Sequence, residues 1–385
     1  MMSNIPFNAT ASQLGSSAKD GKDNTEPATM LDKLRSVNIE MGPGLRDVQA
    51  FTTQLAVMLK AGINIRDAID GVASQVQNKK FKNILEQICS DVESGIPFSE
   101  ALDKYPKVFK PLYVNMIKAS ELSGGLASML DRLAKFLDSQ IETRTMVISA
   151  MVYPIIIGVM AIVTVIFMLT FVLPRFTALF AGKEDLLPAP TVMLLAISDF
   201  LQNQWYLAIG SVVAIGVGIK LLLNTEKGGN VWDRFKLRMP LMGKMFRALY
   251  ISQSMNTMAE LLSAGVGMLQ TLEITADIAG NSVYRNMWLD VRNAVKQGDR
   301  LTTPLLEKDI LPRNVIQMIS AGENSGKLGE VMQDVAAFYA RELKGAIKVV
   351  TSMIEPIMIV VMGMIVGFIA MSIILPIFKM SSVVK

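Results

Sequence analysis

Three long apolar stretches, residues 145–174, 205–223 and 356–378, constrain the fold of this chain more than any other feature. The first and third hold no charged side chain, and the second holds only Lys220, close enough to its end to reach lipid headgroups. A helix needs about 20 apolar residues to cross about 30 Å of hydrocarbon. Only 19% of the residues are charged, against about 25% in ordinary soluble proteins. We therefore predict three transmembrane helices.

Before the first stretch, apolar residues recur at the spacing of amphipathic helices. Val48, Phe51 and Leu55 form one such stripe, and Gly62 and Gly95 stand where helices would end. No segment alternates between apolar and polar residues for long enough to indicate a strand. The pattern predicts an all-α domain of six helices, large enough at about 100 residues to bury its own core.

The same pattern returns after the second apolar stretch. Ala61 corresponds to Ala264, an offset of 264 − 61 = 203 residues, and Glu121 corresponds to Glu323, an offset of 323 − 121 = 202. The match continues through the first and third apolar stretches, which end in LPRF and LPIF. A unit of one helical domain plus one transmembrane helix is therefore duplicated. The unmatched middle stretch returns the chain to the side on which the second domain folds.

Basic residues flank the apolar stretches on the side of the helical domains, whereas residues 174–204 hold only Arg175 and Lys183. The positive-inside rule therefore predicts cytoplasmic domains, a cytoplasmic N-terminus and a periplasmic C-terminus. The expected segments, in chain order, are a disordered cytoplasmic tail (1–45), cytoplasmic helical domain 1 (46–145), transmembrane helix 1 (146–173), a periplasmic segment (174–204), transmembrane helix 2 (205–223), a cytoplasmic linker (224–247), cytoplasmic helical domain 2 (248–347), transmembrane helix 3 (348–378) and a periplasmic tip (379–385).

Composition excludes several kinds of chemistry. The chain has no histidine, which rules out histidine-dependent triads and His-ligated zinc. Cys89 is the single cysteine, so no disulfide forms within the chain, and its place on an apolar stripe indicates a small core residue. The net charge is +4, and the basic residues gather beside the apolar stretches. We therefore expect no enzymatic activity and no nucleic-acid partner.

One phrase occurs in both copies, as ASELSGGL at residues 119–126 and AGENSGKL at 321–328. The second copy superficially resembles a phosphate-binding loop, but such a loop needs four residues between its glycines and a hydroxyl after its lysine. Here the glycines are one residue too close, and Leu328 follows the lysine. The first copy has no lysine at all. A nucleotide site is therefore rejected.

The repeated phrase is better explained as a break between two helices. Its glycines suit the conformation that ends a helix, and its serines can bond free amide groups near the break. Glu121 and Glu323 are expected to neutralise the free N–H groups of the following helix. The predicted hinge residues in this phrase are Ser123, Gly124, Ser325 and Gly326.

The two matched transmembrane helices carry a further predicted flex point and a packing motif. Pro154 and Pro356 fall just inside them, and each removes one helical hydrogen bond, so a kink is expected. A proline that the membrane helix simply tolerates explains them equally well. Gly363 and Gly367 form a G-x-x-x-G motif that permits close helix packing. Dimerisation and packing against the first transmembrane helix both fit this motif.

Together these elements resemble a known family. They are FTTQLAVMLKAG (residues 51–62), the two E-x-S-G phrases, and the membrane segments AMVYPIIIGVM and SMIEPIMIVVMGMIVGFIAMSIILPIF. The chain is similar, over residues 45–380, to the inner-membrane platform proteins of type II secretion systems and type IV pilus machines, the secretion protein F family. It departs from that family at the third position of FTTQ, where members of the family often have arginine. It also has Ser120 in the first phrase where the second has Gly322.

The resemblance implies a non-enzymatic protein of the bacterial inner membrane that acts as a homo-oligomer. Its implied partners are a hexameric secretion or pilus ATPase, other inner-membrane assembly components and pilin-like subunits. Some members hold a divalent cation in the first domain, and Glu121 is the position at which this sequence would hold Ca²⁺; no other cofactor is implied. The competing hypothesis is a small-molecule transporter or channel subunit, which would need polar groups deep in its transmembrane helices.

Overall fold

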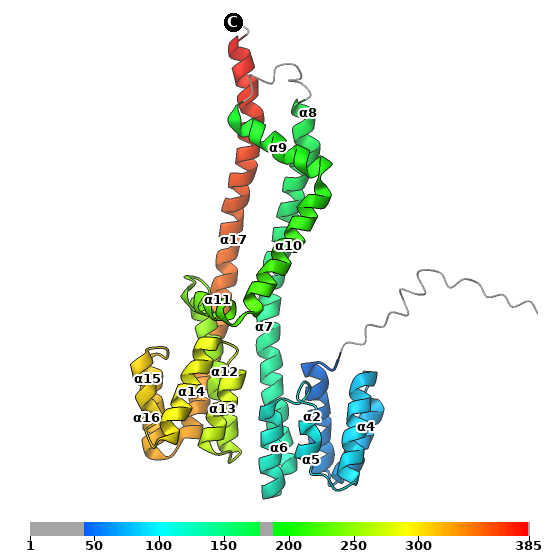
Figure 1. Ribbon diagram of the computed structural model, residues 1–385, viewed down its shortest axis with the longest axis vertical. Helices are drawn as coiled ribbons and strands as arrows, with labels where there is room; N and C mark the ends of the chain where they lie inside the picture. Colours follow the sequence, from blue (N-terminus) through cyan, green and yellow to red (C-terminus); the bar gives the residue numbers. More distant parts are fainter. Residues whose placement is uncertain (1–41, 178–187, 384–385) are drawn as a thin grey trace, which may run out of the picture. The chain divides into compact units, whose positions relative to one another are not determined.

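The computed structural model describes residues 42–177 and 188–383. In that part of the chain every regular element is helical (Figure 1), so the predicted all-α class is confirmed. Three helical segments, Leu126–Phe176, Trp205–Asn224 and Leu328–Pro376, are long and apolar enough to cross a membrane. The three predicted transmembrane helices are thereby confirmed by length and composition.

Each copy of the duplicated unit builds a domain of six helices, and the last of the six continues into a transmembrane helix. In the first domain these are α2 (Leu45–Lys60), α3 (Ile65–Gln75), α4 (Lys79–Glu93), α5 (Phe98–Asp103), α6 (Pro111–Ser123) and α7 (Leu126–Phe167). In the second they are α12 (Gly243–Ser263), α13 (Met268–Ile278), α14 (Ser282–Lys296), α15 (Thr302–Lys308), α16 (Arg313–Ser325) and α17 (Leu328–Val383).

The start of several helices follows from the polar residue that precedes them. Asn64 accepts a hydrogen bond from the backbone N–H of Asp67 at 2.9 Å, and Asn281 accepts one from Val283 at 2.9 Å. These side chains satisfy amide groups that have no partner within the helix. Pro111 begins α6, where its missing N–H costs nothing.

Each domain has an apolar core, and the first core also takes in Leu261, Val266 and Ile274 of the second domain. The first contains an aromatic cluster in which the ring centroids of Phe51 and Phe81 lie 5.9 Å apart, edge to face. Cys89 is buried in this core, as its apolar stripe predicted. The second core is built around Trp288 and Tyr284, both fully buried on α14.

Two helices lie where the sequence predicted only connecting segments. The first transmembrane segment ends in a short π-helix, η1 (Met168–Val172), and α8 (Leu173–Thr177), and the first of the two unpredicted helices, α9 (Ala189–Asn203), follows. α9 joins both matched membrane helices, because Ser198 donates to the Leu169 carbonyl at 2.5 Å and Thr191 donates to the Ser372 carbonyl at 2.6 Å. The wider turn of a π-helix leaves such a carbonyl free for an outside donor.

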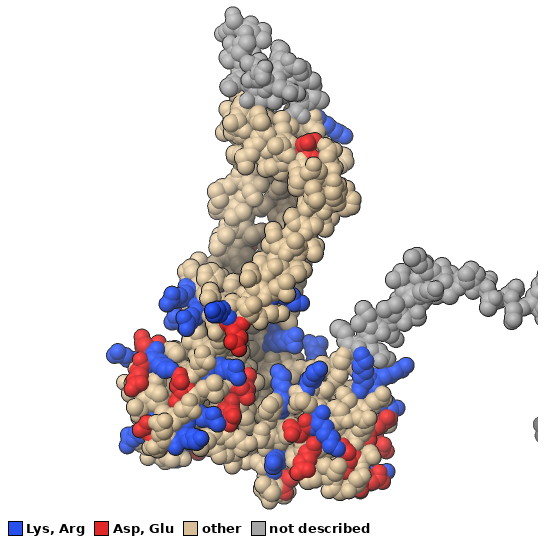
Figure 2. All heavy atoms as spheres, in the orientation of Figure 1, with Lys and Arg blue, Asp and Glu red and all other residues tan. Residues whose placement is uncertain are grey.

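The second unpredicted helix is α11 (Glu226–Arg238), which follows the middle membrane helix α10 (Trp205–Asn224) within the segment predicted as a linker. It packs against α12 and α14. Figure 2 shows charged side chains spread over the helical domains and almost none along the membrane helices. This distribution agrees with a chain that crosses a bilayer.

Candidate functional site

The glutamate of the first E-x-S-G phrase stabilises the short helix α5. The side chain of Glu121 accepts a hydrogen bond from the backbone N–H of Ser99 at 3.2 Å, and its second oxygen accepts one from the Ser99 hydroxyl. Ser99 lies in the first turn of α5 and is buried. A carboxylate there satisfies an amide group and offsets the positive end of the helix dipole.

The second copy repeats this arrangement. Glu323 accepts a hydrogen bond from the backbone N–H of Leu301 at 2.8 Å, and one from the hydroxyl of Thr302 at 3.3 Å. Both donors lie at the start of α15. The expectation that these glutamates serve the following helix is wrong: each acts on the short helix that precedes its own in the chain. The sequence could not show this, because the two partners are 22 residues apart.

The glycines and serines of the phrase lie at the end of α6 and α16. Gly124 and Gly326 have φ values of +76° and +70°, the left-handed conformation that glycine adopts without strain. The serine hydroxyls do not bond amide groups as expected. Ser123 instead donates to the carbonyl of Ser120 at 3.4 Å, and Ser325 donates to the carbonyl of Gly322 at 3.3 Å.

The residue before each glutamate differs between the copies for a steric reason. A Cβ atom placed on Gly322 would lie 3.0 Å from the Cβ and a Cγ atom of Val331, and 3.3 Å from the backbone of Leu328. In the first copy Ser120 is buried at this position and donates to the Ile117 carbonyl at 2.7 Å. The residue that corresponds to Val331 is Met129, whose unbranched side chain carries one Cγ atom where valine carries two.

The predicted kink and packing residues lie in continuous helix. α7 runs without a break past Pro154, and α17 runs past Pro356. A Cβ placed on Gly363 or Gly367 would meet nothing within 4 Å. Within the described residues of one chain, therefore, the G-x-x-x-G face makes no close helix contact.

The two copies meet along α7 and the helices of the second domain. Lys344 bonds Glu142 at 2.9 Å, and these residues occupy equivalent positions, 202 apart in the chain. Arg132 also donates to the Ser263 carbonyl at 3.1 Å. Burial raises the pKa of the nearby Glu260 carboxyl, while the charges of Arg132 and Lys135 lower it. The duplicated units thus contact each other through positions that have diverged into opposite charges.

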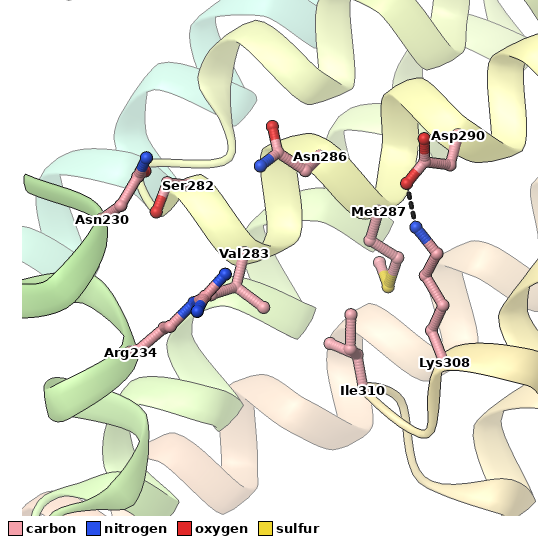
Figure 3. Close-up of a pocket in the computed structure, with 9 residues that line it drawn as sticks. All are labelled: Asn230, Arg234, Ser282, Val283, Asn286, Met287, Asp290, Lys308 and Ile310. Atoms are coloured by element: carbon pink, nitrogen blue, oxygen red, sulfur yellow. Dashed lines mark hydrogen bonds and ion pairs between the residues drawn. The ribbon is translucent and has the colours of Figure 1, made fainter. Parts of the chain in front are cut away.

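A polar pocket of about 430 Å³ lies between α11, the start of α14 and the end of α15 (Figure 3). Asn230 and Arg234 of α11 line it, and Ser282 and Asn286 face them from α14. An ion pair between Lys308 and Asp290 closes one side. Sequence analysis found no reason to group these residues, because their helices come together only in the folded domain.

Glu121 is the position at which the sequence resemblance implied a divalent cation. Calcium takes six to eight oxygen ligands, commonly from several carboxylates. Both carboxylate oxygens of Glu121 already accept hydrogen bonds from Ser99. Among the residues that the structure describes, no three Asp, Glu, Cys or His side chains gather in a way that could hold a metal ion. The calcium prediction at Glu121 remains untested, and we derive no chemistry from it.

The fold defines a class of membrane protein in which a six-helix domain and its membrane helix are duplicated around a third membrane helix. The family model for type II secretion system (T2SS), protein F, matches residues 51–174 and 255–376, once in each copy. The chain belongs to this family, so the resemblance drawn from the sequence is confirmed.

Curated relatives cover most of the chain. A type IV pilus assembly protein PilC of Thermus thermophilus is 39% identical over 348 residues, covering 90% of this chain and 86% of that protein. PilC of Pseudomonas aeruginosa is 31% identical over 339 residues, covering 88% and 91%. The type II secretion system protein F of Aeromonas hydrophila is 29% identical over 353 residues, covering 91% and 90%.

Proposed function

We propose that this chain is a non-enzymatic inner-membrane platform of a filament-assembly machine. It would couple a cytoplasmic hexameric ATPase to the extraction of pilin-like subunits from the membrane and their assembly into a filament, together with other inner-membrane assembly components and further copies of itself. Its domains would be cytoplasmic, its N-terminus cytoplasmic and its C-terminus periplasmic. No nucleic-acid partner is proposed.

One observation carries this proposal: each soluble domain shares a helix with the membrane. α7 and α17 begin as the sixth helix of a domain and continue, without an interruption, into a membrane segment. A movement imposed on either domain is therefore transmitted directly to the membrane helix. Because the chain lacks histidine and a phosphate-binding loop, the energy must come from a partner.

The relatives favour a pilus machine over a secretion system. Two pilus assembly proteins are 39% and 35% identical to this chain and two secretion proteins are 29% and 28% identical, although the fimbrial assembly protein PilC of Pseudomonas putida is 27% identical. We therefore propose type IV pilus assembly as the role, with type II secretion as the alternative within the same family.

The proposal is tested by deleting the gene and counting surface filaments. We expect filaments to disappear while processed pilin-like subunits remain in the inner membrane and the ATPase remains at its normal level. Normal filament numbers in the deletion strain would refute the platform role. Solute uptake by proteoliposomes containing the purified protein would instead favour the transporter hypothesis.

A sharper test changes only the continuity of α7. Residues 143–145 lie between the first domain and the membrane segment, and they are replaced either by three glycines or by three alanines. Both variants lose Arg144, but glycine costs about 1 kcal/mol per position in a helix and alanine does not. We expect the alanine variant to assemble filaments and the glycine variant to insert normally yet assemble few. Equal assembly would show that the continuous helix does not carry the motion.

A further inference from the structure

The helix α11 begins one residue after the membrane helix α10 ends. Thr225 separates them and caps α11, since its hydroxyl accepts a hydrogen bond from the backbone N–H of Gly228 at 3.2 Å. A Cβ atom on Gly228 would overlap the carbonyl oxygen of Leu222. The backbone at Gly228 packs directly against the end of the membrane helix α10. This contact holds α11 at the level of the lipid headgroups.

α11 presents opposite faces to the second domain and to its surroundings. Asp233 and Leu237, four residues apart, face the domain: Asp233 accepts a hydrogen bond from the backbone N–H of Ser282 at 2.8 Å, and Leu237 packs on the domain core. Val231 and Phe235, also four residues apart, are 69% and 52% exposed. An apolar face that no part of the described chain covers needs another apolar surface.

Aromatic and basic side chains complete that exposed face. The rings of Trp232 and Phe235 stack with centroids 5.7 Å apart, and the ammonium group of Lys236 lies 5.9 Å from the Trp232 ring. Lys227, Arg234 and Arg238 are exposed, and within the described residues none has an ion-pair partner. Lys236 is paired with Asp233 at 3.1 Å, but a tryptophan together with unpaired basic side chains on one helix is typical of helices that lie in a membrane interface.

One of these cations reaches the polar pocket. Arg234 lies beside Asn230 of its own helix, and the side chains of Ser282 and Asn286 line the same space (Figure 3). The carboxylate of Asp290 is neutralised by Lys308, so the guanidinium of Arg234 is the uncompensated charge in this pocket. A guanidinium with nearby hydroxyl and amide donors matches the oxygens of a phosphate group.

We propose that α11 lies in the plane of the membrane interface and binds an anionic phospholipid, with Val231, Trp232 and Phe235 among the acyl chains and Arg234 on the lipid phosphate. Two observations favour a lipid over a protein partner: the face is continuous with a membrane helix, and its charge is opposite to that of an anionic leaflet. The proposal requires that α10 crosses a membrane. It does not rest on the role in pilus assembly.

The test is quenching of Trp232 fluorescence by brominated lipids in nanodiscs that hold the full chain. Trp205 begins α10 and is replaced by phenylalanine, whereas Trp288 is fully buried in the second domain and serves as an unquenched background. Brominated phosphatidylglycerol or brominated phosphatidylcholine is added at low fraction to phosphatidylcholine. We expect both lipids to quench Trp232, and phosphatidylglycerol to associate about five times more strongly for each basic residue engaged.

Three variants make the outcome specific. Arg234→Gln should reduce the preference for phosphatidylglycerol about fivefold, whereas Lys296→Gln removes one positive charge from the opposite end of α14 and should leave it unchanged. Leu122→Trp, combined with Trp232→Phe, places a tryptophan at an 87% exposed position. That position precedes α7, about 30 Å of helix before its membrane segment, and should not be quenched.

An unquenched Trp232 in folded protein would overturn the proposal. Disulfide crosslinking of Val231→Cys between two copies would then identify the face as an interface between copies. Quenching with equal association of the two lipids, unchanged by Arg234→Gln, would overturn the assignment of Arg234 to a lipid phosphate.

Discussion

The two helical domains use the same helix cap but differ in the polar groups of their cores. In the first domain the hydroxyl of Tyr113 lies 3.0 Å from that of Thr52, which in turn donates to the Val48 carbonyl at 2.6 Å. In the second, four buried polar atoms have no hydrogen-bond partner within the described residues. They belong to Ser254, Thr257, Tyr284 and Trp288.

Both copies nevertheless share one polar interaction, the hydrogen bonds from a short helix to a glutamate. The cores have diverged in their buried polar groups, yet Glu121 and Glu323 both hold the first turn of a short helix. Burial raises the pKa of both Tyr113 and Tyr284, so both phenols remain protonated at neutral pH. A buried donor without a partner lowers stability. We therefore expect the first domain to be the more stable of the two.

The largest effect should come from removing the shared glutamate. Glu121→Ala leaves two donors of Ser99 without a partner, and Glu323→Ala does the same to Leu301 and Thr302. Each change should lower the free energy of unfolding of its domain by about 3 kcal/mol, since each buried unpaired donor costs about 1–3 kcal/mol. Hydrogen exchange of α5 and α15 in the solubilised full chain measures both domains at once.

Matched controls separate this effect from loss of charge. Glu100→Ala and Glu307→Ala remove exposed carboxylates from the same short helices. We expect both to change exchange little. If Glu100→Ala and Glu307→Ala had the same effects as Glu121→Ala and Glu323→Ala, the hydrogen bonds to the short helices would not explain the role of the repeated phrase.

The next largest effect concerns the left-handed glycines. Gly124→Val and Gly326→Val force a branched side chain into φ values of +76° and +70°. We expect each to destabilise its domain by about 2 kcal/mol, measured by thermal unfolding. Gly345→Val is the control, because this exposed glycine lies in regular helix with open space around its Cα. An unchanged melting temperature in the Gly124→Val and Gly326→Val variants would show that the helix break does not depend on glycine at these positions.

A third prediction tests the steric difference between the copies. Gly322→Ser places a side chain 3.0 Å from Val331, and overpacking of this kind costs about 1–3 kcal/mol. The double variant Gly322→Ser with Val331→Met copies the pair found in the first domain. It should recover most of the loss in urea unfolding. If the double variant is no more stable than Gly322→Ser alone, Val331 is not what excludes a side chain at position 322.

Replacing a buried threonine by valine should affect stability less than the changes above, and differently in the two cores. Thr52→Val removes the partner of Tyr113 and should cost about 1 kcal/mol. Thr257→Val removes a hydroxyl that has no hydrogen-bond partner in the described residues, and should be neutral or stabilising. Equal losses in thermal unfolding would show that the second core satisfies its polar groups as fully as the first.

The smallest effect should be that of Lys327→Ala. Its side chain is 68% exposed and lies 3.8 Å from Glu330, and an exposed ion pair contributes about 0–1 kcal/mol. We expect no measurable change in stability or in filament assembly. Specific nucleotide binding that this variant abolishes would restore the phosphate-loop interpretation rejected from the sequence.

Much of the fold could be predicted because it depends on local patterns. Apolar stripes at helical spacing predicted the domain helices, and uncharged stretches predicted the membrane helices. α9 and α11 were missed for different reasons. α9 is apolar with few polar interruptions and shows no clear stripe, whereas the basic residues of α11 were interpreted only as a sign of topology. Residues 1–41 and the predicted outer residue Lys183 lie outside the described part of the chain.

By itself the sequence determined the helical class, the duplication and the conformation of Gly124 and Gly326, because these follow from periodicity, hydropathy and local backbone sterics. Only the tertiary structure decided what Glu121 and Glu323 do, which polar atoms lack partners, and how Arg234 enters a pocket with Ser282. These are contacts between helices distant in the chain. A side chain's partner is then set by how the helices pack, and that packing cannot be read from any one segment.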